Sequence, residues 1–227
     1  MENNDLFNTS ISFEDLVNIG DMWFRHLAKQ VEEEKNKEEE KIKSYPIQLK
    51  HVGFSEKDIR KYNIDTRYRY FMIVGKDNGK PLIDRMFIAQ WNFNTEEKIL
   101  ENLNSDCRYV MIEAIEIGKY TKEDKKKYKY LKGDFRLESH WAIVDKENWK
   151  IVYMNEEMFG NQPYLYNNVM YSKKTGYVYL PTMKPLMDGS YVSNTLHTKN
   201  KIIIKKNYND DHATIIDTNT GEISIME

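Results

Sequence analysis

Hydrophobic residues near the start of the chain follow the period of an α-helix. They recur on one helical face, apart from a six-residue step before Trp23. Ser12 is a suitable N-cap with Asp15 as its capping partner, and Pro46 marks the end of the helix. The pattern therefore predicts a polar arm over 1–11 and an amphipathic helix within 12–45. The apolar positions of this helix are Phe13, Leu16, Val17, Trp23, Leu27 and Val31.

The second half of this helix has almost no apolar residues. The run EEEKNKEEEKIK, residues 32–43, consists mainly of good helix formers, and pairs such as Glu33 and Lys37 stabilise a helix when four residues apart. We expect this part to project from the body, either as a solvated extension or held by a neighbouring subunit. In the arm, Phe7 and Ile11 are isolated apolar anchors and candidate partner-binding residues.

After Pro46 the pattern changes to short β-like runs, which predict an α+β core domain over 46–158. The run 67–75 and its return over 82–93 flank KDNG, whose Asn-Gly pair suits a hairpin turn. Short helices are expected at SEKDIRKY, capped by Ser55, and at TEEKILENLN, capped by Asn94. The run CRYVMIEAIEI is apolar on both faces, which is typical of a central strand. Two further runs form a hairpin around DKEN, at 135–144 and 149–154.

The region 159–227 contains short β-like runs separated by turn signals. KKTG, KPLMDG, NYNDD and TNTG interrupt runs such as GYVYLP and KIIIKKNY. The predicted fold class is thus α+β, with a long N-terminal amphipathic helix followed by a mainly antiparallel β body of hairpins, a meander or a small barrel or sandwich. The region 159–227 is either a domain of its own or a continuation of the core sheet.

Composition limits the partners and the compartment. The 227 residues carry a net charge of −2, with 27 Lys and 7 Arg, so any nucleic-acid site has to be a local patch. The single Cys107 excludes an internal disulfide and suits a reducing compartment. The start, MENNDLFNTS, is polar, and no run has the roughly 20 apolar residues of a membrane helix. We expect no membrane contact and a location in the cytoplasm or in a particle assembled there.

The most basic segment is KYTKEDKKKYKYLKGD, residues 119–134, with seven Lys against two Asp and one Glu. Such a segment can release counterions from a phosphate backbone, and its tyrosines can stack on unpaired bases. An exposed connection between two strands has the same composition, and we expect the segment to be such a connection. The candidate partner-binding residues here are Lys125, Lys126, Lys127, Tyr128 and Tyr130.

The strand that follows places polar residues on one face. Asp134, Glu138 and His140 alternate with Phe135, Leu137 and Trp141, and Arg136 lies between the acids. Two carboxylates and an imidazole can bind a divalent metal or exchange protons, which makes these three residues the weak catalytic candidates. An ordinary half-exposed strand with a neutralising charge ladder gives the same pattern. If Glu138 and His140 shared a pocket with Glu113 or Asp145, an enzymatic function would be favoured.

The remaining motifs give no direct indication of catalysis. The chain has no Walker loop, no GxGxxG and no GxSxG, and its five His lack metal-ligand spacing. We therefore expect no cofactor or metal, and a non-enzymatic structural or binding protein that is a homo- or hetero-oligomeric subunit of a larger assembly. The A/T-rich codons of its abundant residues fit a phage or virion component. The alternatives are a metal-dependent hydrolase or nuclease using the Asp/Glu/His row, and nucleic-acid binding through residues 119–132.

Overall fold

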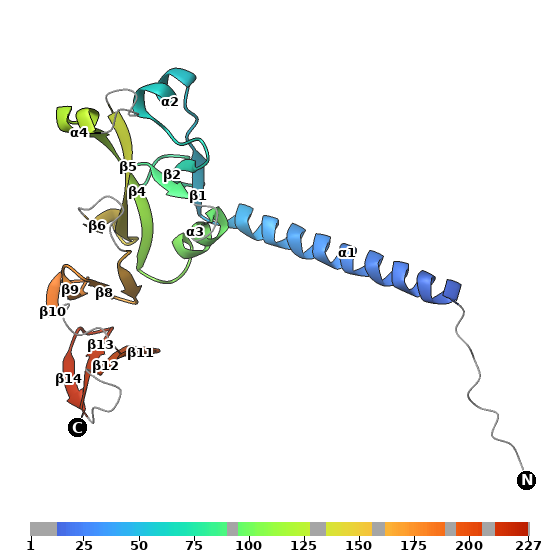
Figure 1. Ribbon diagram of the computed structural model, residues 1–227. Helices are drawn as coiled ribbons and strands as arrows, with labels where there is room; N and C mark the ends of the chain where they lie inside the picture. Colours follow the sequence, from blue (N-terminus) through green and yellow to red (C-terminus); the bar gives the residue numbers. More distant parts are fainter. Residues whose placement is uncertain are drawn as a thin grey trace, which may run out of the picture. The chain divides into compact units, whose positions relative to one another are not determined.

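The computed structural model describes residues 13–89, 95–127, 135–155, 162–188, 194–205 and 212–226, with the backbone alone in residues 13–24, 124, 127 and 194. The chain divides into two compact units, Met1–Tyr45 and Pro46–Glu227. Helix α1 (Phe13–Ser44) makes up the described part of the first unit (Figure 1). It ends two residues before Pro46, where the sequence predicted its end.

The second unit consists mostly of antiparallel β-sheets with short helices, which is the α+β class expected from the sequence. Its first sheet has six strands that neighbour one another in chain order (Figure 1). The longest pair is β4 with β5, whose eleven residues each are in register along their full length. The strands are β1 (Ile47–His51), β2 (Arg69–Gly75), β3 (Phe87–Ala89), β4 (Tyr109–Lys119), β5 (Phe135–Asp145) and β6 (Lys150–Met154).

Both faces of the first sheet are covered along much of their area. On one face, α3 (Glu96–Leu103) packs Ile99 and Leu103 onto the central strands in a core that includes Phe71, Phe87 and Ile112. On the other face, α2 (Glu56–Tyr62) contributes Ile59 to a second cluster around Tyr70, Ile88 and Ile115. Burial on both faces explains why the sequence of β4 reads as a continuous apolar run, and β4 lies between β3 and β5 as predicted.

The region after residue 162 forms two four-stranded antiparallel sheets. The second sheet has the order β10-β9-β8-β7, and the third has the order β11-β12-β13-β14. Tyr109 and Ile143 of the first sheet share a buried cluster with Met170 and Val178 of the second. The second-sheet strands are β7 (Tyr164–Tyr166), β8 (Val169–Ser172), β9 (Gly176–Tyr179) and β10 (Lys184–Met187). The third-sheet strands are β11 (Asn194–Thr198), β12 (Lys201–Lys205), β13 (Ala213–Asp217) and β14 (Ile223–Met226).

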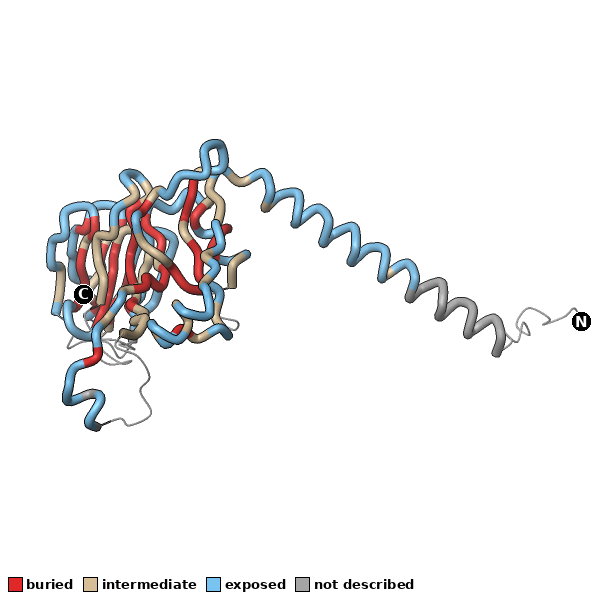
Figure 2. Tube along the Cα trace, turned by 90° about the horizontal axis from the view of Figure 1, so that it is seen from above, coloured by how far each residue is buried: buried red, intermediate tan, exposed pale blue. Residues whose placement is uncertain are grey.

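A shared hydrophobic core joins the second and third sheets. Val169 and Tyr177 of the second sheet are buried together with Ile202, Ile204 and Ile216 of the third. In Figure 2 the part of the chain that follows α1 shows buried segments joined by exposed connections. Hydrogen bonds reinforce the contact: the Tyr166 hydroxyl donates to the Thr198 carbonyl, and Asn167 Nδ2 donates to the Lys199 carbonyl at 3.1 Å.

Some helix caps and turns were predicted correctly from the sequence, and others were not. Ser55 caps α2 with a capping box through Asp58, and the KDNG turn connects β2 to β3, with Gly79 at φ +60°. The cap of α3 is Thr95, whose hydroxyl accepts from the Lys98 amide, so the prediction of Asn94 was wrong. Of the expected strand over 82–93, the described residues 82–89 are regular only in β3, and residues 90–93 lie outside the described residues.

One segment predicted as a turn is a strand. Lys184–Met187, part of KPLMDG, pairs with β9 as β10. Pro185 can take part because β10 is the edge of its sheet, where a missing amide hydrogen breaks no ladder. No described helix is long and apolar enough to cross a membrane.

Candidate functional site

The polar row on β5 lies on one face of the first sheet, as the sequence predicted for its described members. Glu138 is opposite Glu116 of β4, and His140 is opposite Ala114. Partners directly opposite in an antiparallel pair share a face, so this row continues the core face that carries Ile112. Asp134, the third candidate of the row, lies outside the described residues.

The acids of this face are engaged in ion pairs. Arg136 Nε donates to Glu138 Oε1, and Arg85 Nη1 lies 2.5 Å from Glu116 Oε1. Gly118 gives the Glu138 side chain its room, because a Cβ atom at Gly118 would overlap that carboxylate. The row therefore has the neutralising charge ladder that the sequence offered as the structural interpretation.

His140 is buried and held by the backbone. Its side chain is 6% exposed, and Nδ1 lies 2.9 Å from the Asn155 carbonyl oxygen. Nε2 lies 3.6 Å from Glu138 Oε2, and within the described part of the chain it makes no hydrogen bond. This geometry gives the ring one fixed orientation, facing a carboxylate that Arg136 already neutralises.

Glu113 and Asp145 lie on the face of the sheet opposite to Glu138 and His140, so they do not share a pocket with that row. Glu113 pairs across the sheet with Trp141, and Asp145 pairs with Tyr109. Arg108 holds Asp145 through bonds of 3.0 and 2.8 Å, and these bonds keep the pKa of the carboxyl below its usual range. Among the described residues, no cluster of three or more His, Cys, Asp or Glu could hold a metal ion.

The basic segment after β4 connects two neighbouring strands of one sheet, and it includes the short helix α4 (Lys122–Lys127). The helix was not predicted from the sequence. Lys125 and Lys126 are exposed, and α4 includes the backbone of Lys127. Tyr128 and Tyr130 lie outside the described residues, as do the arm residues Phe7 and Ile11.

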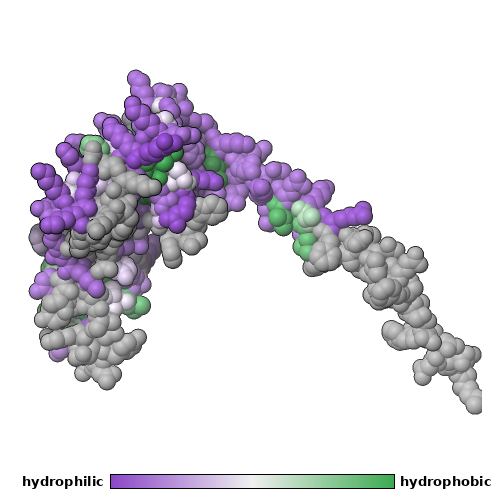
Figure 3. Space-filling view, turned by 45° about the horizontal axis from the view of Figure 1, so that its top comes forward, coloured by the Kyte–Doolittle hydropathy of each residue, from purple (hydrophilic) through white to green (hydrophobic). Residues whose placement is uncertain are grey.

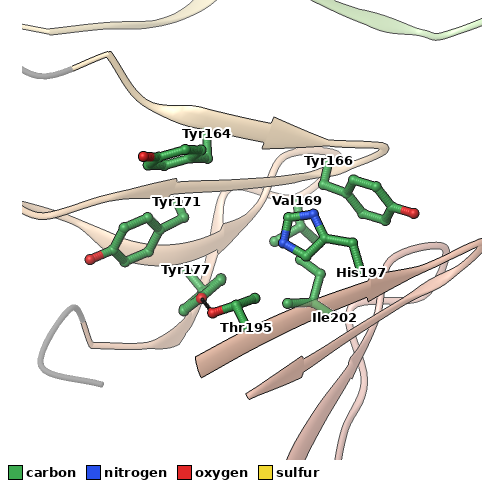
Figure 4. A pocket seen from close by; sticks show the side chains of 8 residues that line it. All are labelled: Tyr164, Tyr166, Val169, Tyr171, Tyr177, Thr195, His197 and Ile202. Atoms are coloured by element: carbon green, nitrogen blue, oxygen red, sulfur yellow. Dashed lines mark hydrogen bonds between the residues drawn. The ribbon is translucent and has the colours of Figure 1, made fainter. Parts of the chain in front are cut away.

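A hollow lined by aromatic residues lies between the second and third sheets (Figure 4). This tyrosine cleft has a volume of about 310 Å³. Three tyrosines stand in register on neighbouring strands, because Tyr164 pairs with Tyr171 and Tyr171 pairs with Tyr177. The cleft is lined by Tyr164, Tyr166, Val169, Tyr171, Tyr177, Thr195, His197 and Ile202.

The rings of the tyrosine cleft contact one another in two groups. The ring centroids of Tyr164 and Tyr171 are 6.2 Å apart, and those of Tyr171 and Tyr177 are 4.7 Å apart. At the other end, the rings of Tyr166 and His197 are 4.5 Å apart (Figure 4). The Tyr177 hydroxyl lies 3.5 Å from Thr195 Oγ1.

Two phenols of the cleft have a raised pKa. Burial raises the pKa of Tyr177, and it also raises that of Tyr171. The sequence did not predict a cleft between these strands. Its only signal was the repeated spacing of tyrosines in the runs YLYNNVMYS and GYVYLP, which becomes a site only when the strand register is known.

No protein-family model matches this chain, and no curated protein matches it.

Proposed function

We propose that this chain is a non-enzymatic structural or binding protein that acts as a subunit of a larger assembly, and that the amphipathic helix α1 is its contact with a second copy of the chain. The observation that carries the proposal is the exposure of α1. From Arg25 to Ser44 every side chain is exposed except Leu27 and Ile42, which are half-buried (Figure 2).

Within its own unit, α1 lacks the usual source of helix stability, because the unit contains no second described element to pack against it. In folded proteins most helical stability comes from packing an apolar face, and not from intrinsic propensity. The ion pairs Lys29–Glu33 and Lys43–Glu39 are surface pairs, and each contributes about 0.3–0.5 kcal/mol at most. A partner that covers one face of α1 supplies the missing packing energy.

The apolar stripe gives this partner a surface to contact. Val31 is 63% exposed, although a core-facing valine in a packed helix is normally buried. In Figure 3 the described part of α1 is hydrophilic except for one hydrophobic patch. Leu27 and Val31 are four residues apart and share a face. They continue the apolar positions that the sequence places before residue 25.

The charges of α1 suit a second copy of the same chain. The segment 32–43 carries both Glu and Lys in alternating blocks, so an identical helix presents both signs to it.

The ion pairs of the β5 row support the non-enzymatic part of the proposal. Glu138 and Glu116 are each paired with an arginine, which makes them poorer metal ligands and poorer bases than unpaired carboxylates.

Hydrogen exchange of the α1 backbone tests the proposal. We expect amides from Arg25 to Ser44 to exchange slowly in the full chain, because a covered helix opens less often than a solvated one. Leu27→Gln with Val31→Gln should abolish this protection while preserving helix propensity. Lys29→Gln is the matched control, because Lys29 lies two residues from both and faces away from them. Fast exchange in the unmodified chain would contradict the proposal.

A further inference from the structure

The tyrosine cleft combines flat apolar surfaces with hydroxyl groups. Tyr164, Tyr171 and Tyr177 form a row across β7, β8 and β9, and Thr195 and His197 face them from β11 (Figure 4). Tyrosine offers an apolar ring and a polar hydroxyl on the same side chain, so a ligand can stack and form hydrogen bonds at once. The volume of about 310 Å³ is at the lower end for small-molecule sites.

One ring of the row is accessible from solvent. Tyr164 is 67% exposed, and β7 is the edge of the second sheet. Its ring contacts Tyr171 on one side, so a ligand can approach from the other side. An exposed tyrosine ring at the rim of a cleft can stack on a ligand and also form a hydrogen bond with it.

Charge restricts the class of ligand. Among the described residues that line the cleft there is no Asp, Glu, Lys or Arg, and His197 contributes an imidazole. Phosphate and carboxylate ligands are normally bound by Arg or Lys, and hard cations by carboxylates. A neutral molecule with several hydroxyl groups and an apolar face suits this lining better than an anion or a hard cation does.

We propose that the tyrosine cleft binds a neutral sugar ring, with the C–H face of the sugar against Tyr164 and its hydroxyl groups bonded to Thr195, His197 and the tyrosine hydroxyls. The described lining residues include no pair of carboxylates, which hydrolysis of a glycosidic bond normally needs. The cleft therefore holds the sugar without cleaving it. This inference is independent of the assembly role proposed for α1.

The test is a titration of the full ¹⁵N-labelled chain with the methyl glycosides of glucose, galactose, mannose and N-acetylglucosamine. Single rings bind weakly, so the titration extends to about 50 mM. We expect at least one glycoside to cause saturable shifts of the Thr195 and His197 amides. Absence of such shifts with all four glycosides would overturn the proposal.

Substitutions then locate the binding. Tyr164→Ala should weaken it about tenfold, which corresponds to about 1.4 kcal/mol of stacking. Tyr164→Phe, which preserves the ring, should cost much less. Leu196→Ala is the matched control, because Leu196 is 61% exposed and lies between Thr195 and His197 on the opposite face of β11. Equal affinity in Tyr164→Ala and the unmodified chain would refute the assigned contact.

Two other ligands separate the competing explanations. Tetramethylammonium tests an aromatic cage for a cation, and oligothymidylate tests base stacking. We expect neither to shift Thr195 and His197 at concentrations where the sugar saturates. Saturable binding of tetramethylammonium alone would replace the sugar by a quaternary amine. Salt-sensitive binding of oligothymidylate alone would replace it by single-stranded nucleic acid.

Discussion

Gly221, in the turn between β13 and β14, lies directly against the ring of Tyr179 on β9. A Cβ atom at Gly221 would fall 2.6 Å from Cγ of this ring, and the Tyr179 hydroxyl donates to the carbonyl of Asn219 in the same turn. Gly221 has φ +71°, a conformation that side chains rarely adopt. This contact helps to hold the second and third sheets together, and with them the two sides of the tyrosine cleft.

Substituting this glycine should destabilise the body of the protein. Gly221→Ala adds both backbone strain and a clash with a ring, and we expect the free energy of unfolding to fall by at least about 2 kcal/mol. Gly79→Ala is the matched control, because Gly79 has φ +60° but open space around it. The control isolates the strain, about 1 kcal/mol. Urea unfolding of both variants gives the comparison, and equal losses would mean that the ring contact contributes nothing.

The Arg108–Asp145 pair predicts a pH dependence of stability. Asp145 also accepts from the Glu147 amide at 3.0 Å and from Asn148 Nδ2 at 3.1 Å. Because its folded pKa is lowered, its contribution is present above the unfolded pKa of about 3.9 and is lost as pH falls through the folded pKa.

Asp145→Asn should therefore lower the free energy of unfolding at pH 7 by about 1–3 kcal/mol, and by less at pH 3. Urea unfolding at both pH values measures this difference. Asp84→Asn, at an exposed carboxylate, is the control and should have little effect at either pH. A loss for Asp145→Asn that is the same at pH 7 and pH 3 would show that the charge of Asp145 is not the cause.

The sequence predicted those features of the fold that depend on neighbouring residues. The α2 cap at Ser55, the KDNG turn and the central position of β4 all follow from local patterns. Lys184–Met187 was misread because a Pro-containing run is a turn in most contexts, and only the edge position of β10 makes it a strand.

The candidate sites depended on information that one strand does not contain. Alternation along β5 placed Glu138 and His140 on one face, but Asn155, which holds His140, and Arg85, which pairs with the neighbouring Glu116, come from other segments. Arg85 reaches Glu116, the residue opposite Glu138, only because of the long-range register of β3 with β4. The tyrosine cleft needed the register of three strands and the packing of a second sheet, so no local pattern revealed it.

The lysines of α4 should be dispensable for stability. We expect Lys125→Ser, Lys126→Ser and Lys127→Ser together to change the melting temperature little, because surface substitutions usually stay within about 0.5 kcal/mol each. Thermal unfolding followed by circular dichroism measures this. A large fall would mean that the segment is packed and is not an exposed connection between β4 and β5.

The ion pairs of the row on β5 predict that divalent metals do not change the stability of the protein. Because Arg136 occupies Glu138 and Arg85 occupies Glu116, we expect millimolar Mn²⁺ or Zn²⁺ to leave the melting temperature unchanged. Calorimetry with and without a chelator makes the comparison. A metal-dependent rise that Glu138→Gln removes would instead favour the hydrolase or nuclease alternative.

We propose above that α1 joins this chain to a second copy. The most direct measurement is the solution mass of the untagged full chain by light scattering on a sizing column, because scattering gives mass independently of shape. The chain weighs 27.2 kDa, and we predict a defined multiple of this value that falls toward one copy in the Leu27→Gln, Val31→Gln variant. A mass of one chain at every concentration, unchanged by these substitutions, would contradict the account.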